Sequence, residues 1–168
     1  MRRSKHALAL ALVAAPVVSV FAGAEIDVFM RAVGYALTGS DDADPKAVDR
    51  KNCVFTLGQD TYRLNNVHVD RIKIQGWQQS SPRLGVQHYV TVSLHGDETV
   101  VEHLTTPLVD DSSEFMRLYR RDHPEAFTAQ RERYKERELR LNTSDQDRVT
   151  RAWQYIYDNG CSGKKSPF

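Results

Sequence analysis

The sequence has none of the short motifs that mark the common nucleotide-binding and hydrolytic sites. A P-loop, a His-Glu-x-x-His helix, a nucleophile elbow and a Cys-x-x-Cys pair are all absent from its 168 residues. A catalytic site would therefore have to be assembled from residues that lie far apart in the chain. The absence of these motifs favours a protein that binds a partner or ligand and performs no chemistry.

Cysteine is also scarce, because only Cys53 and Cys161 are present. In an oxidising compartment a lone pair of this kind usually forms one structural disulfide. The chain-entropy model gives about 4.7 kcal/mol of stabilisation for closing a loop of about 100 residues. A reactive thiol is the weaker alternative, since no local feature activates either sulfur. We therefore predict a Cys53–Cys161 disulfide.

Only one long apolar run is present, over residues 7–21. It is shorter than the roughly 18 to 20 residues that span a bilayer, and Pro16 interrupts it. Three basic residues precede the run and three small residues follow it, which is the pattern of a secretory signal peptide. A permanent anchor is the alternative. We predict a signal peptide over 1–24, a single domain over 25–168, periplasmic or secreted localisation, and no stable membrane insertion after cleavage.

The sequence has no strong excess of either charge. The whole chain has 23 basic and 22 acidic residues, and removing Arg2, Arg3 and Lys5 with the signal leaves two more acidic than basic residues. Sequence-independent nucleic-acid binding needs a large basic surface. We therefore predict no nucleic-acid partner.

The first half of the exported chain predicts one helix followed by strands. Apolar residues recur at helical spacing between Ile26 and Leu37, and Gly39 ends the pattern. After a polar loop come five β-rich segments, which are CVFTL, TYRLN, VHVDRIKIQGW, VQHYVTVSL and TVVEHLT. Their short connections predict an antiparallel meander of about five strands, with the helix packed on one face.

The C-terminal third predicts two to three helices. Residues 111–113 can cap a short helix, and the stripe Val149, Trp153 and Ile156 predicts a longer one that Gly160 ends. Between them, the charged segment 127–141 has apolar residues seven positions apart, which indicates a helix with a narrow apolar stripe.

The charged segment leaves two interpretations open. Its basic residues include Arg131, Arg133 and Arg137, and they form either a strip for an anionic partner or one face of a solvated helix. Glutamates interleave with these arginines at spacings that suit helix-surface ion pairs, which favours the solvated face.

The order of elements predicts an α+β fold. A helix, a curved antiparallel meander and further helices resemble, in outline only, the cystatin-like and NTF2-like folds. The resemblance covers the order of elements and brings no matched motif. Such folds include binding proteins, inhibitors, isomerases and hydrolases, so the resemblance implies an architecture and does not choose a function.

The segment HYVTVSLHGDETVVEH, residues 88–103, alternates like a β-hairpin and contains three histidines. A turn at Gly96-Asp97 would place Val90 opposite His103, with His88 about 7 to 8 Å away on the diagonal. His95 would lie roughly 24 Å from His88 along the strand, too far to join them. The core face would be formed by Val90, Val92, Leu94 and Val101.

The preceding segment VHVDRIKI adds a second group of polar residues. His68 and Asp70 share the parity of Ile72 and Ile74. Either a bulge near Asp70-Arg71 changes the phase of the strand, or the strand carries His68 and Asp70 inward. In the second case a single concavity with acid, base or metal-ligand capacity would be lined by His68, Asp70, His88 and His103. Otherwise each histidine is a structural residue.

We therefore expect a small exported α+β protein of the bacterial cell envelope that acts as a non-catalytic binding or interaction module. Its partner would be an unknown protein or a small ligand, and we predict neither a cofactor nor a bound metal. The alternative is a pocket enzyme or metal-binding protein that uses His68, Asp70, His88 and His103. A third possibility is a structural envelope protein that docks through its charged C-terminal helices.

Overall fold

The computed structural model describes residues 19–108 and 113–166, and the side chains of helix α1 from residue 28 onward. Most of the predicted signal peptide, residues 1–18, lies outside the described residues. Helix α1 (Ser19–Thr38) runs across the predicted cleavage point after Ala24. Within the described ranges, no helix is long and apolar enough to cross a membrane.

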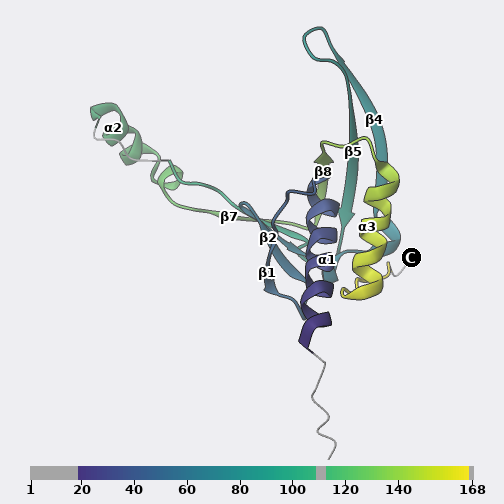
Figure 1. Cartoon of the computed structure of the whole chain (residues 1–168). Coiled ribbons are helices and arrows are strands. Elements are labelled where there is room, and N and C mark those ends of the chain that lie inside the picture. Colours follow the sequence, from purple (N-terminus) through teal and green to yellow (C-terminus); the bar gives the residue numbers. More distant parts are fainter. Residues whose placement is uncertain (1–18, 109–112, 167–168) are drawn as a thin grey trace, which may run out of the picture.

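The fold is α+β, as predicted, and its strands form two antiparallel sheets (Figure 1). The five-stranded sheet has the order β1-β2-β3-β6-β7. Its strands are β1 (Lys46–Asp49), β2 (Val54–Leu57), β3 (Asp60–Arg63), β6 (Val101–Leu104) and β7 (Arg131–Tyr134). The three-stranded sheet has the order β4-β5-β8, with β4 (Lys73–Ser81), β5 (Gly85–His95) and β8 (Glu136–Leu141).

The core lies between the helices and the sheets. Helix α3 (Gln146–Asn159) packs beside α1, α1 also contacts β8, and α3 contacts β4. The apolar stripe predicted for α3 is buried, and β5 contributes three fully buried residues at alternate positions. These residues are Val149, Trp153 and Ile156 on α3, and Val90, Val92 and Leu94 on β5. Each fully buried side chain of this kind stabilises the fold by about 1.5–3 kcal/mol.

The predicted disulfide is confirmed. Cys53, directly before β2, is bonded to Cys161, just after α3, with their Cα atoms 5.6 Å apart. Both residues are buried. The bond therefore fixes the end of the C-terminal helix to the start of the five-stranded sheet.

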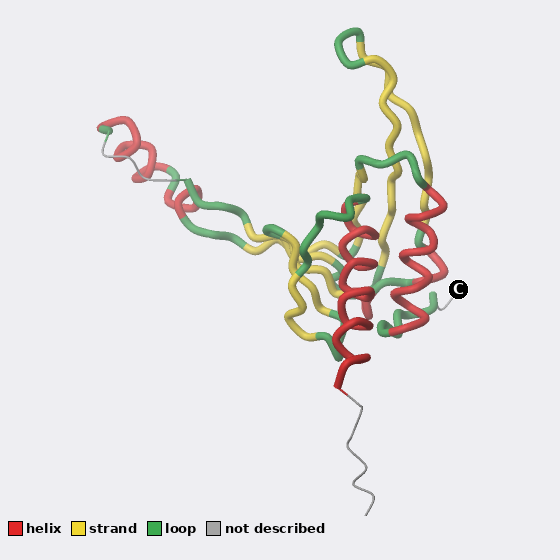
Figure 2. Tube along the Cα trace, viewed as in Figure 1, coloured by secondary structure: helices red, strands yellow, loops and turns green. Residues whose placement is uncertain are grey.

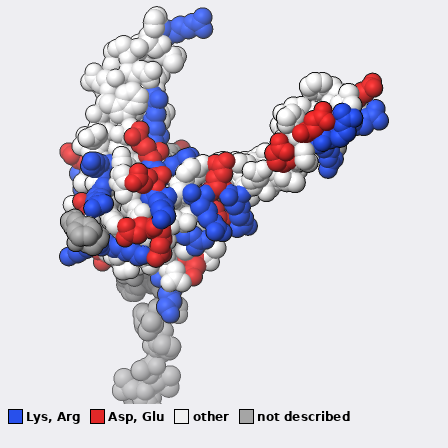
Figure 3. Space-filling model, turned by 180° about the vertical axis from the view of Figure 1, so that it is seen from behind, with Lys and Arg blue, Asp and Glu red and all other residues white. Residues whose placement is uncertain are grey.

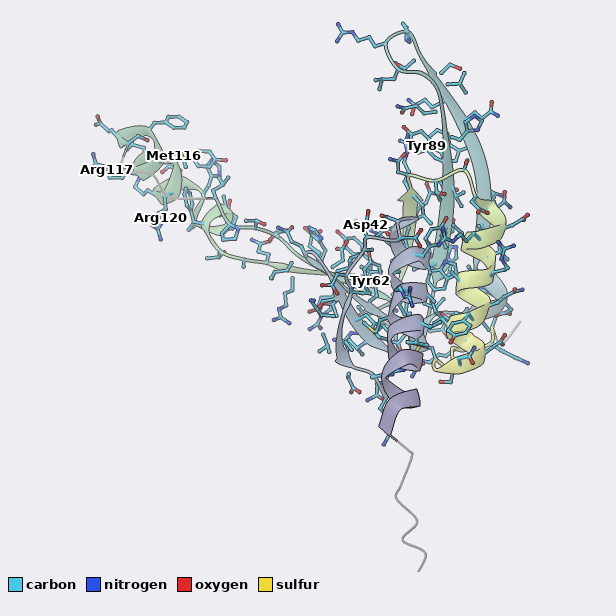
Figure 4. The ribbon with its side chains drawn as sticks, viewed as in Figure 1. Asp42, Tyr62, Tyr89, Met116, Arg117 and Arg120 are labelled. Atoms are coloured by element: carbon cyan, nitrogen blue, oxygen red, sulfur yellow. A yellow bond between two sulfur atoms is a disulfide. The ribbon has the colours of Figure 1, made fainter. Side chains whose placement is uncertain are left out.

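Two arms project from the body (Figure 2). One is the β4–β5 hairpin, which extends beyond the end of β8. The other, the α2 arm, joins β6 to β7 and carries helix α2 (Glu114–Asp122) and the 3-10 helix η3 (Pro124–Phe127). Figure 4 shows Met116, Arg117 and Arg120 at the far end of this arm, away from Tyr62 in the body.

The helix predicted over residues 127–141 is wrong, because β7 and β8 occupy most of this segment. The alternation of apolar and charged residues determines the structure of this segment. Leu139 and Leu141 are buried on one face of β8, and Arg140 between them is exposed. Long-range pairing of β7 with β6, and of β8 with β5, supplies the hydrogen bonds that local helix propensity would otherwise satisfy.

The predicted hairpin over residues 88–103 is also wrong. Strand β5 pairs with β4 and β8, whereas β6 pairs with β3 and β7. The connection between β5 and β6 crosses from one sheet to the other at Gly96. A Cβ atom there would lie 2.3 Å from the Asn66 carbonyl oxygen, so the close approach requires glycine. The predicted core face is nevertheless correct, since Val90, Val92, Leu94 and Val101 are all buried.

Candidate functional site

Of the two alternatives at His68 and Asp70, the structure supports the change of phase. A 3-10 turn, η2 (Val69–Arg71), interrupts the chain before β4 begins. His68 is buried and donates from Nε2 to Asp97 Oδ2 at 3.1 Å. Asp70 is exposed, and its carboxylate accepts a bond from the Ser166 N–H, which lowers the pKa of Asp70.

The other two candidates lie in different sheets. His88 is exposed on the β4–β5 hairpin, opposite Gln78. His103, on β6, donates from Nδ1 to Asp60 Oδ1 at 2.6 Å. His88 and His103 are therefore not neighbours, and the concavity imagined for all four residues is not formed. Among residues 19–108 and 113–166, no group of three or more His, Cys, Asp or Glu side chains is placed to hold a metal ion.

Asp60 is a partner that the sequence did not suggest for His103. The two residues face each other across the β3–β6 pair. The second carboxylate oxygen of Asp60 accepts a bond from the Tyr62 hydroxyl at 3.3 Å. Burial, with a smaller contribution from the negative charge of Asp60, raises the pKa of Tyr62 above its ordinary range. The carboxylate of Asp60 therefore has a hydrogen-bond partner on each of its two oxygens.

A concavity lies where the five-stranded sheet meets the β5–β6 connection. This charged cleft has a volume of about 560 Å³. Its walls are polar and mix both charges, and the residues that line it are Arg63, Asn66, Asp97, Glu98, Thr99, Glu102, Arg133 and Lys135. The cleft therefore includes Asp97, the exposed partner of His68. None of the four candidate residues, His68, Asp70, His88 and His103, lines it.

Glu102 organises the basic wall of the cleft. It is only 7% exposed, on the central part of the sheet between β3 and β7. Its carboxylate accepts bonds from Arg131 Nη1 at 3.0 Å and Arg133 Nε at 3.3 Å, and Arg63 Nη2 lies 4.0 Å away. A buried carboxylate needs such partners to offset its desolvation. One negative charge therefore holds three positive charges together.

The acids on the opposite side of the cleft have partners of their own. Asp97 is hydrogen-bonded to His68, and Glu98 pairs with Lys164 at 3.0 Å. The side chain of Lys135 has no ion-pair partner among the residues that the structure describes. On the basic wall, Arg63, Arg133 and Lys135 outnumber the carboxylate of Glu102, and Arg131 lies beside them on the same carboxylate. Asp97 and Glu98 supply the negative charge of the opposite wall.

Figure 3 shows basic side chains gathered where the α2 arm leaves the body. Strand alternation places Arg131 and Arg133 on one face of β7, and Lys135 follows in the bend between β7 and β8. A helix would have spread the same residues around its circumference. The alternating sequence was the available signal for a strand, and the strand excludes the solvated helix face.

Comparisons with known proteins found no matching family model, no curated protein with significant sequence similarity and no solved structure with significant similarity.

Proposed function

We propose that this protein is an exported binding module that holds an oxyanion in the charged cleft and performs no chemistry on it. The observation that carries the proposal is the convergence of Arg63, Arg131 and Arg133 on the buried carboxylate of Glu102. The signal-peptide pattern and the disulfide support a periplasmic or secreted location in the bacterial envelope.

The arginines keep donors free for a ligand. A guanidinium group has five N–H donors in a planar fork. Arg131 uses Nη1 and Arg133 uses Nε towards Glu102, while both side chains are more than three-fifths exposed, at 67% and 68%. The remaining donors suit the two-pronged recognition of phosphate, sulfate or carboxylate groups.

The basic side chains of this wall are held in fixed positions, unlike isolated cations on a protein surface. Arg63 comes from β3, and Arg131 and Arg133 from β7, on either side of Glu102 on β6. Each side chain is therefore anchored on a hydrogen-bonded strand, which lowers the entropy that a ligand would cost on binding. The oxyanion could belong to a small ligand or to an acidic segment of a partner protein, because both present the same chemical group.

Titrations of the purified, disulfide-bonded protein at low ionic strength test the proposal. Inorganic pyrophosphate, citrate and an aspartate-rich peptide serve as probes, and calorimetry or NMR shifts report binding. Arg133→Gln and Lys135→Gln should each weaken binding by about tenfold or more, because a hydrogen bond to a charged group contributes about 1.5–3 kcal/mol. Tighter binding of the peptide than of the small anions would identify a protein partner.

Arg83→Gln is the matched control. Arg83 is also exposed, but it lies at the tip of the β4–β5 hairpin, away from the cleft. This substitution removes the same charge and should leave the affinity unchanged. Equal weakening by Arg83→Gln and Arg133→Gln would show that only net charge matters, and an absence of binding to all three probes would reject the proposal.

A further inference from the structure

The outer half of the β4–β5 hairpin is a two-stranded ribbon that pairs with no third strand among the described residues. Strand β8 ends at Leu141, opposite Val90, so residues 85–89 of β5 extend past it. On the other side, β4 is the last strand of its sheet. We call residues 77–81 and 85–89 the distal ribbon; Figure 1 shows it projecting beyond the helices and β8. Two-stranded ribbons alone are only marginally stable in water.

The inner half of the β4 edge is closed by a side chain. Gln146, at the start of α3, accepts a bond from the Gly76 N–H and donates one to the Ile74 carbonyl, both at 3.1 Å. These are bonds that a neighbouring strand would otherwise make. They also show that even-numbered residues of β4 direct their main-chain groups outward. Gln78 and Ser80 are therefore the next residues to present N–H and C=O groups at the outer edge.

The outer part of this edge lacks the features that normally prevent strands from pairing. Exposed edges are usually blunted by charged residues, proline or a bulge. From Ile74 to Ser81 the chain has no charged residue and no proline. The register with β5 is continuous from Lys73 to Ser81, so no bulge twists the edge away. In Figure 3 the hairpin is correspondingly almost free of charged side chains between its root and its tip.

The root of the ribbon is braced on one face. Trp77 and Tyr89 stack with their ring centroids 5.0 Å apart, and the Arg140 guanidinium lies 4.0 Å from the Tyr89 ring. Arg140 Nη2 also donates to Gln79 Oε1 at 2.6 Å. These contacts hold the root of the ribbon against β8, so its edge continues that of the three-stranded sheet.

We propose that the outer edges of β4 from two copies of this chain pair antiparallel about a two-fold axis, which joins two three-stranded sheets into one. Pairing of identical edges lets each outward N–H meet a C=O of the partner copy. The residues whose main-chain groups point outward are even-numbered, so each must lie opposite an even-numbered residue of the other copy. A two-fold axis that passes through residue 78, 79 or 80 meets this condition.

Charge favours a second copy over an unrelated strand. An uncharged edge offers nothing that would select a foreign strand by its charges, whereas two such edges meet without like-charge repulsion. The proposal is independent of the charged cleft, which is built on the other sheet.

The test begins with the oligomeric state of the purified, disulfide-bonded protein, measured by light scattering over a range of concentrations. The wild type should form dimers at high concentration. Gln78→Lys with Ser80→Lys should abolish them, because the two-fold axis brings the new charges of the two copies together. The control is Val86→Lys with His88→Lys, which places two charges on the β5 edge and should leave the dimer intact. A wild type that is monomeric throughout would overturn the proposal, as would a dimer that survives the β4 substitutions.

Two further measurements separate the proposed edge from simple misfolding. Mixing the Lys variant with a Gln78→Glu, Ser80→Glu variant should restore a mixed dimer through opposite charges. Single cysteines at 78, 79 and 80 should give a disulfide-linked dimer at one of these positions, since Cys53 and Cys161 are already paired. Failure of the charge-swapped pair to associate, or cross-linking only from cysteines on β5, would contradict the β4–β4 pairing.

Discussion

The imidazole of His68 and the carboxylate of Asp97 connect two turns that lie 29 residues apart in the chain, with Nε2 and Oδ2 separated by 3.1 Å. The backbone N–H of His68 also donates to the His95 carbonyl at 2.8 Å. His68 is 2% exposed, whereas the side chain of Asp97 is 69% exposed. The bond therefore fixes the acidic side of the charged cleft to the interior of the protein.

Asp97→Ala should lower the free energy of unfolding by about 1–2 kcal/mol, because the buried imidazole loses its side-chain partner. The other ring nitrogen, Nδ1, is already buried without a partner among the described residues. Urea denaturation followed by circular dichroism measures the change. Glu98→Ala is the control on the same turn; its ion pair with Lys164 is exposed and should contribute no more than about 1 kcal/mol. Equal effects of the two substitutions would show that His68 does not depend on Asp97.

The two major helices were predictable because their apolar residues recur at helical spacing over about two to three turns and cannot fit a strand. Val149, Trp153 and Ile156 have one interpretation only. The segment 127–141 was not predictable in this way. Its apolar residues fit a spacing of seven, but Leu139 and Leu141 also fit a spacing of two, and the choice depends on strands β5 and β6, which local pattern does not include.

The site was harder to predict than the fold. The predicted hairpin paired β5 with β6, although each of these strands has two other neighbours. Sequence patterns therefore did not identify Glu102, whose three cations, Arg63, Arg131 and Arg133, lie 39, 29 and 31 positions away. No spacing rule connects such residues. The histidines were candidates because they lie close together in the sequence. In the structure His68 bonds to Asp97, His103 bonds to Asp60, and His88 lies on the β4–β5 hairpin.

The disulfide provides a second prediction. Replacing both Cys53 and Cys161 by alanine should cost about 2–5 kcal/mol of stability, since the bond joins residues that are 108 positions apart in the chain. Thermal unfolding with and without a reducing agent measures the effect. Reduction should lower the melting temperature of the wild type and leave that of the double variant unchanged. Two reactive thiols in the unfolded, unreduced protein would show that the bond does not form in the cell.

Substitution of Glu102 should change anion affinity in the opposite direction to substitution of Arg133. Glu102→Gln removes the carboxylate that competes with a bound oxyanion for Arg131 and Arg133. Anion affinity should therefore rise, on the order of tenfold for the loss of one nearby negative charge. The same substitution should lower stability by about 1–3 kcal/mol, because charge-assisted bonds to a buried group are lost.

Calorimetric titration of Glu102→Gln with pyrophosphate, paired with a denaturation curve, separates these two effects. Glu132→Gln is the matched control, because Glu132 is exposed on the neighbouring strand β7 and bonds to Tyr134 instead. It should raise affinity less than Glu102→Gln. Weaker binding by Glu102→Gln would mean that Glu102 positions the arginines for the ligand more than it competes with it.

Tyr157 predicts how stability changes in alkaline solution. Its hydroxyl donates to the Leu64 carbonyl at 3.1 Å, and burial raises its pKa in the folded state. A group whose folded pKa is raised contributes stability that is complete below its unfolded pKa, about 10 for tyrosine, and is lost as pH rises above that value. Tyr157→Phe should cost about 0.5–1.5 kcal/mol at neutral pH from the lost hydrogen bond, and it should flatten the decline of stability above pH 10. Part of the decline should persist, because burial also raises the pKa of Tyr62. Tyr155→Phe, on the same helix, is the control, and an unchanged alkaline slope in Tyr157→Phe would refute the assignment.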